Sequence, residues 1–113
     1  MAAPRQSRRD TSSYEPESVE GLDELVDALL ALRSDDEVVR FLRDLCTVPE
    51  LEALAHRWQI AQLVDEKVPY LEIADRVKTS TATVTRVAQW LHHGTGGYRT
   101  ALDRTRRRRK ARA

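Results

Sequence analysis

The feature that most restricts the fold is the spacing of the apolar residues, which recur every three or four positions over most of the chain. This period places them on one side of an α-helix and does not match the two-residue alternation of a half-buried strand. Glycine and proline, which interrupt helices, number only four each in 113 residues. We therefore predict an all-α fold of five to six helices in one domain with short tails.

Helix-start signals divide the first half of the chain. Ser34 with Glu37, and Thr47 with Glu50, have the spacing of capping boxes, in which the two side chains accept backbone N–H groups at a helix N-terminus. The apolar positions between these signals predict helices over about 19–33, 35–45 and 48–66.

The second half of the chain contains two clearer helices and one weaker candidate. Pro69 precedes the first, Lys78–Thr79 form a tight turn after it, and Ser80 is placed to cap the second. The glycines of segment Gly94–Gly97 are expected to end the preceding helix and to form a flexible joint. The predicted helices cover about 70–77, 81–92 and, as a basic helix that is frayed or ordered only on DNA, 98–109.

Charge is strongly segregated although the net charge is only +1. Residues 14–98 hold 16 acidic and 8 basic side chains, whereas residues 99–113 hold 8 basic side chains. An acidic body repels phosphate, so nucleic-acid binding would need a local basic surface. We predict a disordered basic tail over 1–17, a helical domain over 18–98 and a basic C-terminal arm over 99–113.

The segment Tyr70–Leu91 has the pattern of a helix-turn-helix, in which two helices cross steeply at a short turn. Ala74 supplies the small side chain that such a crossing needs. The residues expected to lock the two helices together are Ile73, Val77, Val84, Val87 and Leu91.

The second helix of this segment presents small, hydroxyl-bearing and hydrogen-bonding side chains. Ala and Thr methyls suit thymine, Arg suits guanine and Gln suits adenine in the major groove, while hydroxyls suit phosphate. Such a Thr-rich helix has poor intrinsic propensity, which favours DNA reading over the alternative of a solvated face. The arm could likewise be a solvated tail or a phosphate-binding element. The predicted DNA contacts are Ser80, Thr81, Ala82, Thr83, Thr85, Arg86 and Gln89 in the helix, with Arg104, Arg106, Arg107, Arg108, Arg109 and Lys110 in the arm.

Three stretches, Leu51–Ile60, Ile73–Ala74 and Ser80–Val87, resemble the Trp repressor family, and Trp90–Tyr98 resembles its YerC/YecD-like branch. The resemblance covers roughly residues 35–98. It implies an intertwined homodimer in which the first three helices interlock with a partner. Each subunit then presents one reading head, that is, the helix-turn-helix over residues 70–91. It also implies a transcriptional regulator of double-stranded DNA, with repression as the expected mode.

Two positions depart from that family. Lys78 stands where the turn commonly has glycine, so it must adopt a positive φ or shift the turn. Leu71 stands where the tryptophan-sensing repressors have a base-reading arginine. Their operator is therefore not expected to apply here.

The resemblance also raises the question of a co-repressor pocket. Thr47, Arg57 and Arg86 match the residues that hold tryptophan in the tryptophan-sensing members, a set that favours a carboxylate ligand. Val87 and Trp90 replace small residues there and are expected to fill the space themselves. Arg57 would then pair with an acid such as Glu50 or Glu52, and Arg86 would contact phosphate. No cofactor is expected.

Other functions find little support in the sequence. His56, His92 and His93 lack a third ligand at suitable spacing, so we expect no metal, and Trp58 and Trp90 are expected to be core or dimer anchors. No nucleophile–base pair or phosphate loop suggests an enzyme. No apolar run is long enough for a membrane span, so a cytoplasmic protein is expected. The alternative is an acidic helical protein-interaction module with a basic docking tail.

Overall fold

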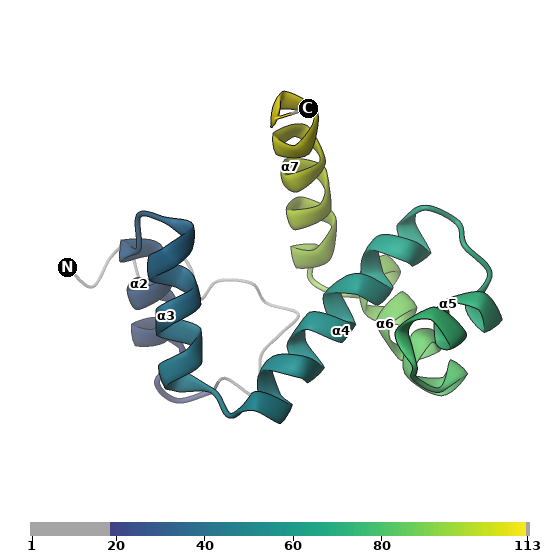
Figure 1. The fold of residues 1–113 in the computed structure, drawn as a ribbon, viewed down its shortest axis with the longest axis horizontal. Helices are drawn as coiled ribbons and strands as arrows, with labels where there is room; N and C mark the ends of the chain where they lie inside the picture. Colours follow the sequence, from purple (N-terminus) through teal and green to yellow (C-terminus); the bar gives the residue numbers. More distant parts are fainter. Residues whose placement is uncertain (1–18, 113) are drawn as a thin grey trace. The chain divides into compact units, whose positions relative to one another are not determined.

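The computed structural model describes residues 19–112, and for residues 107 and 109–112 the backbone only. This described part contains six helices and no strand, which confirms the predicted all-α class (Figure 1). The predicted tail over residues 1–17 lies outside the described residues. The helices are α2 (Leu22–Ala31), α3 (Asp35–Leu45), α4 (Val48–Asp65), α5 (Tyr70–Val77), α6 (Thr81–His93) and α7 (Gly97–Arg112).

The chain divides into two compact units after Leu51. The N-terminal unit contains α2, α3 and the first turn of α4, and the C-terminal unit contains the rest of α4 with α5, α6 and α7. No helix among the described residues combines the length and the apolar character that crossing a membrane requires.

Both predicted capping boxes form in the N-terminal unit. The Glu37 N–H donates to Ser34 Oγ at 3.2 Å, while the Glu37 carboxylate accepts the N–H of Arg33 at 2.6 Å. The second box is fully reciprocal, because the Glu50 N–H donates to Thr47 Oγ1 at 3.2 Å and the Thr47 N–H donates to the Glu50 carboxylate at 2.8 Å. These bonds satisfy N–H groups that have no partner within the helix, and they set where α3 and α4 begin.

The apolar faces of α2 and α3 are only partly covered within the described chain. Neither helix contains a buried residue. Leu30 in α2 is 75% exposed and Val39 in α3 is 49% exposed. Short amphipathic helices draw most of their stability from packing. The N-terminal unit therefore presents an apolar surface that a single chain leaves in contact with water.

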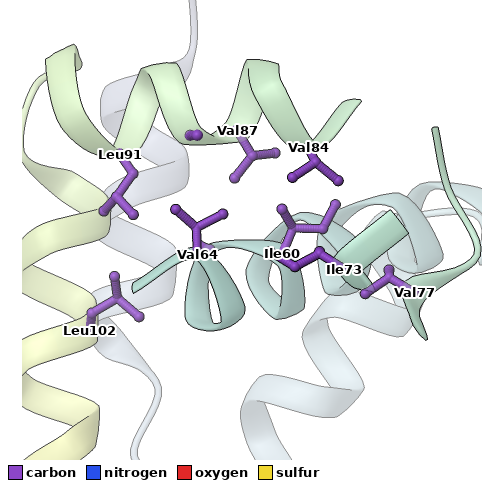
Figure 2. Packing of buried hydrophobic residues seen from close by; sticks show 10 residues of the cluster. Ile60, Val64, Ile73, Val77, Val84, Val87, Leu91 and Leu102 are labelled. Carbon is purple, nitrogen blue, oxygen red and sulfur yellow. The ribbon is translucent and has the colours of Figure 1, made fainter. Parts of the chain in front are cut away.

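The core lies in the C-terminal unit and draws on all four of its helices (Figure 2). Its ten buried residues are Ile60, Ala61 and Val64 from α4, Ile73 and Val77 from α5, Val84, Val87, Ala88 and Leu91 from α6, and Leu102 from α7. The rings of Trp58 and Tyr98 stack beside this core with centroids 6.3 Å apart, which confirms Trp58 as a core-packed residue.

The segment predicted as a basic arm begins as part of this core. Leu102 is only 4% exposed, and Figure 2 shows its side chain directed toward Val64 of α4. Only residues 94–96 separate α6 from α7, so the predicted joint is shorter than expected. A single leucine among arginines is a weak sequence signal, yet its burial against α4 stabilises the first turns of α7 in the free chain.

Candidate nucleic-acid interface

The crossing of α5 and α6 is held by the residues that the sequence singled out. Ile73 and Val77 on α5 face Val84 and Val87 on α6, and all four are buried (Figure 2). Ala74 is half-buried against the same cluster, as the close approach of the two helices requires. In the same view, Ile60 and Val64 of α4 also face α6, beside Ile73. Two helices packed together across a short turn are therefore present in the segment 70–91.

The turn between the helices depends on one residue with a positive φ. Lys78 has φ 64° and ψ 55°, the left-handed conformation expected for the position where related turns have glycine. Its N–H donates to the Ala74 carbonyl, and so does the N–H of Thr79 at 2.9 Å. The turn thus ends α5 by the usual C-terminal hydrogen bonds, with a lysine side chain in a strained position.

Replacing Lys78 with glycine is expected to stabilise the protein. A Cβ atom in the left-handed region costs about 1–2 kcal/mol, and the added chain entropy of glycine offsets roughly half of that. We expect a gain of about 0.5–1 kcal/mol, or a few degrees in melting temperature by circular dichroism. Lys78→Ala removes the charge but keeps Cβ, so it should show no gain. Equal melting temperatures for the two variants would contradict this account.

Ser80 and Thr83 begin α6 through a local hydrogen-bond pair. The Thr83 N–H donates to Ser80 Oγ at 3.1 Å, and the two hydroxyl oxygens lie 3.1 Å apart. One of the two hydroxyl protons is used between them, so at most one remains to donate to a phosphate. This confirms Ser80 as the N-cap and limits what these two predicted contacts could offer a ligand.

The remaining predicted contacts of α6 form one exposed face. Thr81, Ala82, Thr85, Arg86 and Gln89 are all exposed, on the side of the helix away from its buried valines and leucine. Within the described residues, Arg86 takes part in no ion pair. The face therefore offers two methyl-bearing threonines, a guanidinium and an amide to whatever binds there.

The residues of the possible co-repressor pocket are divided between the two units of the chain. Thr47 Oγ1 accepts the Glu50 N–H in the N-terminal unit, whereas Arg57 and Arg86 are exposed in the C-terminal unit. The predicted pairing of Arg57 with a nearby acid does not occur among the described ion pairs. Val87 is 3% exposed and occupies core space as predicted.

Trp90 does not fill the core, and that prediction is wrong for the single chain. Its side chain is 55% exposed, and its ring lies against Gly94, where any Cβ would come within 2.9 Å of the ring. The helical period explains the difference, because Trp90 lies on the flank of α6 rather than on the side that carries Val87 and Leu91. Its role as a dimer anchor remains a prediction.

The histidines show no sign of a shared site. His56, His92 and His93 are exposed, and the rings of the last two lie edge to face with centroids 6.3 Å apart. No group of three or more potential metal ligands occurs among the described residues.

The predicted arm residues fall into different environments on α7. Arg104 and Arg108 are exposed, whereas Arg106 makes an ion pair with Asp65 at the end of α4. Arg99 binds the same carboxylate. Asp65 was not among the residues that the sequence pointed to, because its partners are 34 and 41 positions away. The side chains of Arg107, Arg109 and Lys110 lie outside the described part of the structure.

Comparisons with known proteins agree with this geometry. The profile of the Trp repressor protein family matches residues 20–106. YerC of Bacillus subtilis is 39% identical over 85 residues, covering 75% of this chain and 82% of that protein. A Trp operon repressor homolog of Mannheimia succiniciproducens is 34% identical over 79 residues, covering 69% and 78% of the two chains. The crystal structure of a TrpR-like protein from Eubacterium eligens superposes with a TM-score of 0.73 at 34% identity, covering 78% of this chain and 91% of that one.

Proposed function

The chain belongs to the Trp repressor family, whose members are DNA-binding regulators and not enzymes, and on this premise we propose that it is a sequence-specific transcriptional repressor that acts as a homodimer. The observation that carries the proposal is the exposed face of α6 on a helix-turn-helix whose crossing is fully packed. A rigid platform is needed if side chains are to meet base edges in a fixed register.

The chemistry of that face favours bases over a protein partner. Thr81 and Thr85 carry methyl groups that suit thymine, Arg86 can bond guanine with two N–H groups, and Gln89 can bond adenine in the same way. The side chains near the N-terminus of α6 are small, so this end of the helix can approach the floor of the major groove. Nothing apolar and large stands on the face itself, as a hydrophobic protein interface would require.

The acidic helical domain repels DNA phosphates, so binding to DNA requires basic residues elsewhere in the chain. Residues 14–98 carry 16 acids and 8 bases, so the reading head alone would attract phosphate weakly. We infer that the basic residues of α7 supply contacts to the DNA backbone. Such contacts add affinity without sequence preference.

The unit formed by α2 and α3 supports the homodimer. Both helices are amphipathic, but neither buries a side chain within the described chain. A second copy would offer the same apolar surface, and a two-fold dimer pairs such surfaces with each other. Two reading heads in one molecule would also match the two half-sites of a palindromic operator.

Selection of bound sequences from a random duplex pool, followed by a salt titration, tests the proposed function. A regulator should recover a shared motif, and its log affinity should fall with log salt by about 0.9 per neutralised phosphate. The acid–base segregation also fits the alternative, an acidic interaction module whose basic tail docks an acidic partner. That alternative gains support if no motif emerges and polyglutamate competes as well as duplex DNA.

Free tryptophan is expected to leave the protein unaffected, because Val87 is buried in the core where a ligand would need space. A ligand at one hundred times its dissociation constant adds about 2.7 kcal/mol of stability. We therefore expect the same melting temperature with and without millimolar tryptophan. A rise of several degrees would show that a pocket exists.

A further inference from the structure

Two arginines of the C-terminal helix bind one carboxylate at the end of α4. Asp65 ends α4, and its side chain is only 13% exposed. Arg99 donates to both of its oxygens, with Nη1–Oδ1 2.9 Å and Nη2–Oδ2 3.1 Å, and Arg106 donates to Oδ2 as well. The bonds from Arg99, and then from Arg106, hold the pKa of Asp65 below its usual value although burial opposes this.

The spacing along α7 explains why these two arginines meet one acid. Arg99, Leu102 and Arg106 follow one another at three and four positions, so they share a side of the helix. Leu102 enters the core on that side, and the two guanidinium groups reach Asp65 beside it. Within α7, Asp103 Oδ1 also accepts from Arg99, from Nη2 at 3.1 Å and from Nε at 3.3 Å. This side of α7 is thus docked by one apolar and two ionic contacts.

The opposite side of α7 carries arginines of a different kind. Arg104 is about 200° around the helix from Leu102, and Arg108 follows it one turn later. Both are exposed, and neither takes part in an ion pair within the described part of the chain. Two arginines with the same chemistry, only two positions apart, therefore differ in whether a carboxylate already neutralises them.

We propose that Asp65 sorts the arginines of α7 into a docked pair, Arg99 and Arg106, and an outward set beginning with Arg104 and Arg108 that contacts duplex phosphates. The inference rests on the proposed DNA binding and specifies which cations take part in it. A phosphate that approaches Arg106 must displace a carboxylate that is already in contact and largely shielded from water, whereas Arg104 exchanges only solvent and counterions. Asp65 is in this account a positioning residue, and Arg106 is removed from the set of predicted phosphate contacts.

A matched pair of substitutions tests this division. Arg104→Gln and Arg106→Gln remove the same charge from the same helix two positions apart. For a random duplex, Arg104→Gln should reduce the slope of log affinity against log salt by about 0.9, and Arg106→Gln should leave it nearly unchanged. Equal reductions in both variants, or no reduction in Arg104→Gln, would overturn the proposal.

A second set of variants tests Asp65 itself. Asp65→Asn should steepen the slope by about 0.9 for each arginine that reaches a phosphate. Glu66→Gln makes the same charge change at the next residue, which forms no ion pair among the described residues, and should leave the slope unchanged. Asp65→Glu keeps the carboxylate and should restore the wild-type slope. Equal slopes for Asp65→Asn and Glu66→Gln would contradict the sorting role.

Amide hydrogen exchange of the free protein separates this inference from the proposed function. Because the Asp65 carboxylate is largely shielded from water while its two arginines are about half exposed, removing it should make the α7 amides of Asp65→Asn exchange about tenfold faster, with Glu66→Gln unchanged. This measurement needs no DNA. If wild-type protein fails to bind duplexes, the proposed function is wrong. If the α7 amides of Asp65→Asn exchange at the wild-type rate, Asp65 does not dock α7, whatever the DNA result.

Discussion

If the protein forms the proposed homodimer, replacing Leu30 with aspartate is expected to make it a monomer at micromolar concentration. Leu30 is 75% exposed on α2, whose described side chains include none that is buried in the single chain. In a dimer that covers this face, the substitution loses about 2 kcal/mol of apolar burial per subunit before any charge is desolvated. Two-fold symmetry counts the change twice, so the dissociation constant should rise at least a thousandfold, corresponding to about 4 kcal/mol.

A matched control distinguishes this effect from a general response to a surface charge. Leu71 in α5 is 77% exposed, and Leu71→Asp introduces the same group outside the N-terminal unit. That variant should remain a dimer by light scattering, whereas Leu30→Asp and Val39→Asp should not. A wild-type monomer, or a dimer that survives both N-terminal substitutions, would remove the intertwined homodimer from the proposal.

Local signals in the sequence predicted the local structure well. The capping boxes at Ser34 and Thr47 place their helix starts at the predicted residues, because the bonds involved join groups only three or four positions apart. Lys78 adopts the positive φ that its place in a helix-turn-helix demands. Residues 70–91 could be assigned from spacing alone, since one helix period sets both the buried and the exposed sides.

Local sequence patterns could not predict the contacts between segments that lie far apart in the chain. Asp65 lies beside Glu66 at the end of α4, and nothing nearby in the sequence indicates that two arginines more than thirty positions away will bind Asp65. For α7, the sequence predicted a basic helix over 98–109 but not its docking, because the packing of Leu102 into the core and the bonds to Asp65 join distant segments. Trp90 shows the converse error, since a large aromatic residue suggests burial and only its angular position on α6 decides against it.

The second large effect is expected from the proposed division between base reading by α6 and phosphate binding by α7. Deleting residues 107–113 removes five basic residues but retains Leu102, Arg99 and Arg106, and with them the docking of α7 on Asp65. The truncated protein should bind every duplex more weakly, on the order of a hundredfold at low salt, with a salt slope reduced by about 0.9 for each phosphate that the protein no longer neutralises. Replacing Arg107, Arg108 and Arg109 with lysine keeps the charge and should keep the slope.

Substitutions on α6 should show the opposite pattern. Thr85→Ala and Gln89→Ala remove no charge, so the salt slope should stay nearly unchanged, whereas removing each base-reading group should narrow the gap between the selected sequence and random DNA by about 1–3 kcal/mol. Both quantities come from the same titrations of the two duplexes, measured by fluorescence anisotropy. The deletion is expected to change only the salt slope and to lower the affinity for both duplexes equally. The reason is that a uniformly cationic segment has no side chain that distinguishes base pairs. If it abolished the sequence preference while the α6 variants kept it, the protein would read DNA through its C-terminal segment, and α6 would not be the recognition helix.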